Sequence, residues 1–342
     1  MPKLSARAQK VLKAVGYGAF YWAALVLFAY LTFPYERLKD RVIQEFNARQ
    51  TGPDAMRLEL DEVGSYWFSG VEASGIRLIS PPKPATPGSD PQNPPKASVL
   101  SIDSAHARVG ILPLLFGSVR LSFGAKAFDG SLSGQTSESD GTRRVEVELE
   151  ELALNKVTLL TDSVGLPLSG TLDGKLEFAL PEGKLAKADG TMSFKIKGLS
   201  AGDGKAKIRD TIALPKVEAG DLTLEGESTT GALKITNFSG AGPDLELSSE
   251  GSVRLRDPIQ SSILALTARF RFTERYMGKN EMTRGLFGAP GSTVPGLFDL
   301  DPKNRKAKGA DGSYGWRVAG PLSLPQFTPH PSAGGAPAKP RR

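Results

Sequence analysis

The sequence predicts a mainly β fold: a curved, mostly antiparallel extended sheet forming an open trough or half-barrel, with one N-terminal transmembrane helix and an adjoining amphipathic helix. Three observations predict it. A long uncharged run stands near the start of the chain, at residues 15–33. From residue 56 onward apolar residues recur at every second position, which is the period of a strand. The alternating runs are spaced by roughly 8 to 15 residues, which leaves room for hairpins but not for crossover helices.

The run at residues 15–33 has the length of a membrane-crossing helix. Its nineteen residues, rising about 1.5 Å each, give a helix of roughly 28 Å, close to the roughly 30 Å of a hydrocarbon core. Aromatic side chains stand near both ends of the run, as they do at the two interfaces of a membrane. We expect the anchor to include Tyr17, Trp22, Leu25, Leu27 and Phe33.

The segment before the run, residues 1–14, predicts the orientation of the anchor. It carries basic residues and no acidic one, so we expect it to stay in the cytoplasm while the rest of the chain is exported. The residues that would set this topology are Lys3, Arg7, Lys10 and Lys13.

Two other interpretations of the run are less favourable. A cleaved secretory signal would have a shorter apolar stretch of about 7 to 15 residues and a small-x-small cleavage site, whereas this run ends in Leu31, Thr32, Phe33 and Pro34. A buried core helix that is apolar all round would need a large protein shell, which the remaining sequence does not predict. We therefore expect a retained anchor.

The charge distribution argues against a nucleic-acid partner. The formal net charge is +6, but basic residues gather at the two ends of the chain, in residues 1–14 and 303–342, and the middle is mildly acidic. Cysteine is absent, which excludes disulfides, thiol catalysis and cysteine metal sites. Stability must come from the sheet and its core.

The chain divides into a series of segments after the anchor. Residues 34–55 form an amphipathic helix and a connection, with the helix expected at residues 35–49. Residues 56–327 form the β domain, and residues 328–342 form a disordered basic tail. Within the β domain we expect a Pro-rich exposed loop at 81–97, a helix at 274–286, a charged loop at 299–308 and a strand from 314 to 324.

The apolar positions of the strands are expected to share one face of the sheet. The clearest alternation is at residues 264–272, where a slip of one residue would expose the whole apolar set. A core is the simplest role for this face, and an open groove that binds lipid or a partner is the alternative. The candidate side chains for the groove or core face are Leu222, Leu224, Leu264, Leu266, Phe270 and Phe272.

The residue inventory predicts that the protein is not an enzyme. Its two histidines are His106, in a strand-like stretch, and His330, in the predicted tail. No nucleophile elbow, phosphate-binding loop or zinc-protease motif occurs. Glu150 and Glu151 are consecutive, so we expect them on opposite faces of a strand, which would prevent paired acid and base catalysis. We therefore predict no catalytic, cofactor-binding or metal-binding residues.

Several glycine and leucine patterns resemble a known family. Residues 107–123, followed by 128–134, resemble the repeating segment of AsmA-like periplasmic proteins. More narrowly, the layout of residues 15–328 is similar to the type II secretion system protein N (GspN) family. The supporting segments are 166–174, 231–238, 242–247, 251–255, 258–261 and 316–325.

The resemblance implies an inner-membrane protein with an AsmA-like sheet in the periplasm, associated with the machine that exports folded proteins through the outer membrane. It implies two functions of different classes. One is a non-enzymatic role in assembling or supporting type II secretion, with the membrane and other components of that system as partners. The other is binding or transfer of phospholipid or another lipid along an apolar groove. A plain scaffold for a partner is the third interpretation, and the family has no catalytic residues to carry over.

Overall fold

The computed structural model describes residues 6–50, 52, 55–82, 97–115, 117–157, 166–203, 207–208, 212–213, 215–288 and 295–331. The predicted Pro-rich loop lies almost wholly outside these residues, as do Lys3 and the end of the predicted tail.

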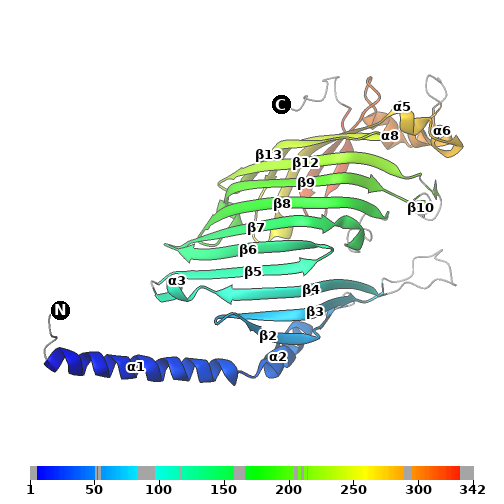
Figure 1. Cartoon of the computed structure of the whole chain (residues 1–342). Coiled ribbons are helices and arrows are strands. Elements are labelled where there is room, and N and C mark those ends of the chain that lie inside the picture. Colours follow the sequence, from blue (N-terminus) through cyan, green and yellow to red (C-terminus); the bar gives the residue numbers. More distant parts are fainter. Residues whose placement is uncertain are drawn as a thin grey trace.

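Two helices open the described chain. Helix α1 (Ala6–Leu31) extends away from the body and is followed, after a break at Pro34, by α2 (Tyr35–Arg49) (Figure 1). Proline fixes its own φ and disfavours helix in the residue before it, which explains the break. Helix α2 covers the residues predicted for it, and the side chain of its Asn47 accepts a hydrogen bond of 2.9 Å from the backbone of Leu58.

Helix α1 differs from the helix predicted at residues 15–33. It begins earlier and ends at Leu31, so Phe33 lies in the break before α2. Among the residues that the structure describes, no helix combines the length and the apolar character needed to cross a membrane. The crossing itself stays a prediction.

The body is one 15-stranded sheet in which every pairing is antiparallel. From β3 onward each strand pairs with the next strand of this sheet along the chain, and the sheet does not close on itself. The prediction of a mainly β, antiparallel and open sheet is confirmed. The strands are β1 (Arg57–Glu59), β2 (Glu62–Tyr66), β3 (Gly70–Ser80), β4 (Ser98–Val109), β5 (Val119–Ala127), β6 (Gly130–Ser139), β7 (Thr142–Ala153), β8 (Leu168–Pro181), β9 (Asp189–Ala201), β12 (Val217–Thr229), β13 (Ala232–Ala241), β14 (Leu245–Arg254), β15 (Ile263–Phe272), β16 (Tyr314–Pro321) and β17 (Gln326–Pro329).

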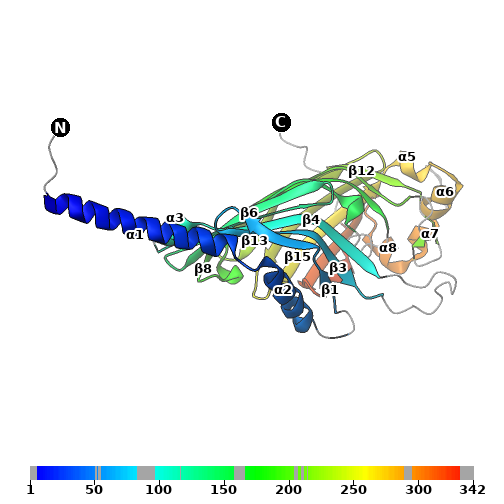
Figure 2. The same cartoon turned by 60° about the horizontal axis from the view of Figure 1, so that its bottom comes forward.

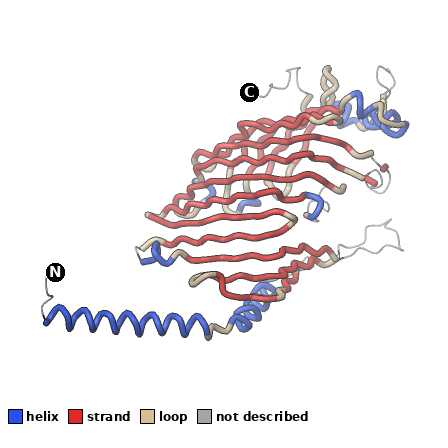
Figure 3. Tube along the Cα trace, in the orientation of Figure 1, coloured by secondary structure: helices blue, strands red, loops and turns tan. Residues whose placement is uncertain are grey.

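One edge of the sheet is shared by two short strands, because β1 and β2 both pair with β3. The other edge is β17. Between β9 and β12 a separate two-stranded sheet is formed by β10 (Lys207–Ile208) and β11 (Ile212–Ala213). The sheet curls continuously, so that its last strands, yellow to red in Figure 1, turn behind the green strands in the middle of the sheet (Figures 1 and 3).

The alternating strand directions divide the connections between two ends of the sheet. We call one the tether end, because the β2–β3 turn there contacts the last turn of α1. The β4–β5 connection, which contains the short helix α3 (Ile111–Leu115), and the β16–β17 turn lie at the same end. We call the opposite end the helical end, because the β15–β16 connection there holds several helices (Figures 1 and 2).

The helical end corrects two sequence-based predictions. The single helix expected at 274–286 is two helices, α5 (Glu274–Met277) and α6 (Glu281–Phe287), because Asn280 forms a capping box with Thr283 and starts a new helix. The prediction of a loop at 299–308 is wrong as well. This segment contains α8 (Pro302–Ala307), preceded by α7 (Leu297–Leu300), and Asp301 caps α8.

The end of the β domain also differs from the prediction. The strand expected over 314–324 stops at Pro321, and a turn leads into β17. Because β17 ends at Pro329, the sheet includes two residues that were assigned to the disordered tail.

The packed core is divided between the two ends of the sheet. At the tether end, buried Leu180, Ala188, Leu233 and Leu255 pack together beneath the short helix η2 (Leu185–Lys187). At the helical end, aromatic rings stack in a second cluster. Its members are Phe270, Phe272, Tyr276, Phe287, Phe298 and Tyr314.

Candidate apolar binding site

A single row of directly paired residues crosses one face of the sheet from β3 to β17. Each member lies opposite the next on the neighbouring strand, from β3 to β17. Every position in it is apolar or glycine, so the row forms a continuous apolar stripe. We call it the apolar row, and it consists of Val71, Ala107, Phe123, Gly134, Val147, Leu176, Met192, Gly226, Ile235, Gly251, Leu266, Val318 and Phe327.

The opposite face is polar along the same strands. Glu148 on β7 lies opposite Lys175 on β8, which in turn lies opposite Ser193 on β9. These three side chains are exposed, whereas their sequence neighbours in the apolar row are half-buried. The alternation predicted from the sequence therefore sorts the side chains onto two chemically different faces.

The six candidate side chains share the apolar face. Leu222 on β12 lies opposite Gly240 on β13, which lies opposite Leu247 on β14, which lies opposite Phe270 on β15. Leu264 and Phe272 occupy the same face of β15 because they are separated from Phe270 by even numbers of residues.

The structure separates these candidates by their surroundings. Leu264 is buried, and Phe270 and Phe272 belong to the ring cluster, where Phe270 stacks on Tyr314 at 5.3 Å between ring centroids. These three side chains therefore belong to the packed core. Leu222, Leu224 and Leu266 are only half-buried.

The apolar face is therefore incompletely covered. Val147, Leu176 and Met192, in the middle of the apolar row, are only half-buried. The body is a single sheet, so only part of its apolar face has a second layer to pack against.

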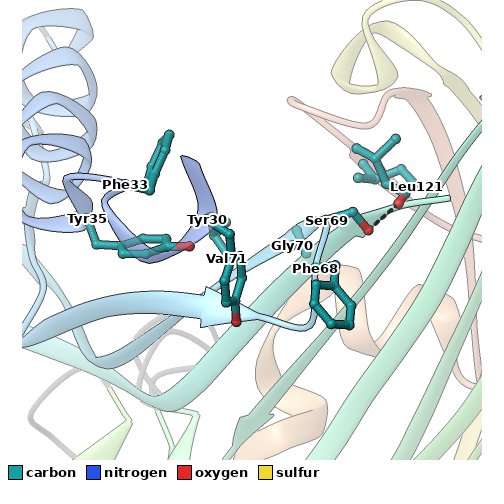
Figure 4. A pocket seen from close by; sticks show the side chains of 10 residues that line it. Tyr30, Phe33, Tyr35, Phe68, Ser69, Gly70, Val71 and Leu121 are labelled. Carbon is teal, nitrogen blue, oxygen red and sulfur yellow. Dashed lines mark hydrogen bonds between the residues drawn. The ribbon is translucent and has the colours of Figure 1, made fainter. Parts of the chain in front are cut away.

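A pocket of about 590 Å³ lies where the apolar row meets α1 and α2 (Figure 4). Its wall toward the helices is aromatic, with Tyr30 from α1, Phe33 from the break and Tyr35 from α2. Val71 and Ala107, the first two members of the apolar row, line it from the sheet. We call it the junction pocket, and its other lining residues are Phe68, Ser69, Gly70, Val109 and Leu121.

Hydrogen bonds and ring contacts shape the junction pocket. Tyr30 donates a hydrogen bond of 3.0 Å to the hydroxyl of Ser65, and its ring lies 5.6 Å from that of Phe68. Ser69 donates a hydrogen bond of 2.7 Å to the carbonyl of Val109, which holds the β2–β3 turn against β4 (Figure 4). The pocket is thus a preformed apolar site at the point where the helices join the sheet.

Sequence reasoning missed the junction pocket. It assigned Phe33 to the anchor and singled out neither Tyr30 nor Phe68. The signal that could have found it is the Trp67–Phe68 pair, because two large aromatic residues between strands are unusual in a turn.

The predicted anchor residues do not contribute equally to this site. Phe33 lines the junction pocket, while Tyr17, Trp22, Leu25 and Leu27 are exposed along α1. Of the four topology-setting residues, Arg7, Lys10 and Lys13 lie within α1.

The regular strand alternation expected at the consecutive glutamates is interrupted. A bulge in β7 between Leu149 and Leu152 places Glu151 at a φ of 53°, so Glu150 and Glu151 both line one polar hollow of about 520 Å³. Asp173 lines it too, and its ion pair of 2.7 Å with Lys197 and a hydrogen bond from the backbone of Glu151 lower the pKa of its carboxyl. Asp173 is therefore an ionised structural acceptor.

His106 is a packed member of the polar face. Its ring stacks on Tyr66 at 4.1 Å between centroids and lies over Gly124, where an added Cβ would come within 2.7 Å of the ring. His330 follows β17 and donates its backbone N–H to Gly315. Within the described ranges, no three or more His, Asp or Glu side chains are grouped so as to hold a metal ion.

No family model matches the chain, and neither a curated protein nor a solved structure is significantly similar to it.

Proposed function

We propose that this protein is a non-enzymatic, membrane-anchored periplasmic component of the type II protein secretion system, acting in the assembly or support of protein export. The observation that carries the proposal is the layout: one open antiparallel sheet behind an N-terminal helix, with the segments that resemble the GspN family distributed along it. Residues 107–123 of that resemblance form part of β4, α3 and β5, and residues 316–325 form most of β16 and the turn after it.

The anchor in this proposal is α1. Its large apolar side chains are exposed around the helix, including Phe20, Tyr21 and Leu31. Exposed apolar surface of this extent is typical of a segment that contacts lipid or another protein. The basic residues at its N-terminal end would keep that end in the cytoplasm.

Deletion of the gene in the bacterium that carries it tests the proposal. We expect proteins that use type II secretion to accumulate in the periplasm instead of the medium, and a plasmid copy to restore their release. A periplasmic protein that never crosses the outer membrane is the control, and its amount should not change. Normal release from the deletion strain, together with a fully assembled secretion apparatus, would refute the role.

Lipid binding along the apolar face is the second candidate function. Two observations favour it: the half-buried apolar row and its continuity with the junction pocket beside α1. An acyl chain that leaves a membrane around α1 would meet the aromatic wall of this pocket first and the apolar row next.

Photo-crosslinking distinguishes an apolar face that binds lipid from one that serves only as a protein core. The unaltered full chain is reconstituted with a phospholipid that carries a diazirine in its acyl chain, and adducts are mapped by mass spectrometry. We expect adducts on the apolar face, at Val147 and Leu176, and none on Glu148 or Lys175 of the same two strands. Adducts confined to α1 would exclude lipid from the sheet.

A further inference from the structure

We propose that the tether end of the sheet is a second membrane-contact surface, which lies in the headgroup region of the bilayer beside α1. The surface consists of the β2–β3 turn, with Trp67 and Phe68, and of helix α3, with Ile111, Leu112 and Leu114. We call it the tether-end tip. The inference rests on the proposed placement of α1 in a membrane, and its partner is a lipid surface.

The topology places the two parts of the tip at the same end. The chain leaves the tether end along β3 and returns to it along the antiparallel strand β4. The β2–β3 turn and α3 therefore lie at the same end. Both parts lie on the side toward which α1 extends, as Figures 1 and 2 show. A membrane that holds α1 would therefore face this end of the sheet and not the helical end.

Contacts with α1 place the β2–β3 turn level with the end of α1 that would lie at the boundary between the hydrocarbon core and the headgroups of the bilayer. Tyr30 belongs to the last turn of α1, and its hydroxyl and ring contact Ser65 and Phe68. Tyrosine and tryptophan prefer the boundary between hydrocarbon and headgroups. If Tyr30 occupies that boundary, Phe68 beside it and Trp67 next to Phe68 must lie there as well.

The tip is exposed and apolar. Trp67 is 65% exposed and Leu112 is 70% exposed, and Phe68, Ile111 and Leu114 are exposed too. Trp67 also has a φ of 53°, a left-handed conformation that is rare for a bulky residue. The hydrogen bond from Ser69 to Val109 holds the turn in this shape. A large apolar side chain presented to water in a strained turn indicates a contact surface.

Charge beside the tip suits anionic headgroups. Arg108 and Arg120 are exposed on the polar face of β4 and β5, next to α3, and neither pairs with a carboxylate among the described residues. Their cross-strand neighbours on that face, Ser122 opposite Arg108 and Ser137 opposite Arg120, carry no charge. Guanidinium groups next to exposed apolar side chains form the combination that binds anionic membrane surfaces.

Single-site labelling tests the inference, because the native chain has no cysteine to interfere. Leu112→Cys carries an environment-sensitive fluorophore, and the full chain is reconstituted in phosphatidylcholine and phosphatidylglycerol vesicles. Met282→Cys in α6, an exposed apolar position at the helical end, is the matched control. We expect blue-shifted emission at position 112, most of which is lost when brominated lipid is included, and neither effect at position 282.

Further variants test the chemistry of the contact. Trp67→Ser with Phe68→Ser should reduce the quenching at position 112. Arg108→Gln with Arg120→Gln should reduce it only in vesicles that contain phosphatidylglycerol and only at low salt. Circular dichroism of each variant checks that the sheet is intact.

The outcomes distinguish this inference from the proposed function. If the chain floats with vesicles but the label at position 112 behaves like that at position 282, the tip does not touch lipid and the inference is overturned while the anchor stands. If the chain does not float, both are overturned. An emission shift in detergent that depends on protein concentration would assign the tip to a second copy of the chain and would also overturn the inference.

Discussion

Asp244 is a fully buried carboxylate that joins three parts of the helical end. It accepts a hydrogen bond of 3.0 Å from the backbone of Glu218 at the start of β12 and one of 3.0 Å from Lys279 beyond α5. Its own backbone carbonyl accepts from Thr273, which caps α5. Charges this deeply buried are stable only while their partners are present.

Replacing Asp244 should therefore destabilise the fold strongly. We expect Asp244→Ala to lower the free energy of unfolding by about 3 kcal/mol, since Lys279 loses its carboxylate partner and the backbone N–H of Glu218 loses its acceptor. Urea unfolding in detergent measures this. Glu45→Ala removes an exposed ion pair with Arg49 in α2 and is the control, expected to cost less than about 1 kcal/mol. Equal effects of the two substitutions would contradict the structural role of Asp244.

Glu182 makes a pH-dependent contribution at the tether end. Hydrogen bonds from Lys184 and Lys187 lower the pKa of its carboxyl to about 2, from 4.5. Because the folded-state pKa is depressed, the stabilisation is fully present above about pH 4.5 and is lost as the pH falls toward 2. Carboxyl chemical shifts in NMR titrations should show this low midpoint. In the double variant Lys184→Gln with Lys187→Gln the midpoint should return toward 4.5, and an unchanged midpoint would refute the assignment.

At the scale of single elements, two hairpins share one turn geometry but differ in their surroundings. The β6–β7 turn has Asp140 at φ 51° and Gly141 at φ 70°, and the β12–β13 turn has Thr230 at φ 50° and Gly231 at φ 73°. Such paired positive φ values are typical of two-residue turns that match the twist of a sheet. A Cβ at Gly141 would meet nothing within 4 Å, whereas one at Gly231 would lie 2.2 Å from the carbonyl oxygen of Ala186.

The two glycines should therefore respond differently to the same substitution. Gly141→Ala should cost about 1–2 kcal/mol, which is the cost of a left-handed alanine. Gly231→Ala should cost about 1–3 kcal/mol more, because it also forces η2 away from the turn. Chemical unfolding of both variants measures the difference. Similar losses would mean that η2 moves freely over the turn.

Some elements could be predicted from local sequence patterns and others could not. The strand period predicted the sheet, because a chain of hairpins needs only alternation and turns, and β15 follows the pattern expected at 264–272. The division of α5 from α6 depended on the cap at Asn280, which the apolar spacing concealed. The bulge at Glu151 has no local sign in the sequence. The junction pocket joins Tyr30 to Ser65, which are 35 positions apart, and no local pattern relates residues at that separation.

At the scale of the whole molecule, the proposed topology can be measured directly. Alkaline phosphatase, which is active only after export, is fused after Gln50, the residue that follows α2. We expect an active fusion. Neutralising Lys3, Arg7, Lys10 and Lys13 should lower that activity, because the basic residues proposed to retain the N-terminus in the cytoplasm are then absent. An inactive native fusion would contradict the proposed orientation.

The strand order has a consequence for how such molecules can change in length. From β4 onward each strand is bonded only to the strands of the sheet that precede and follow it along the chain, so a hairpin could be gained or lost in the middle without rethreading the rest. Strands added two at a time preserve the alternation of direction. Descendants of one ancestor could thus differ in the width of the sheet while keeping the same short strands at its two edges.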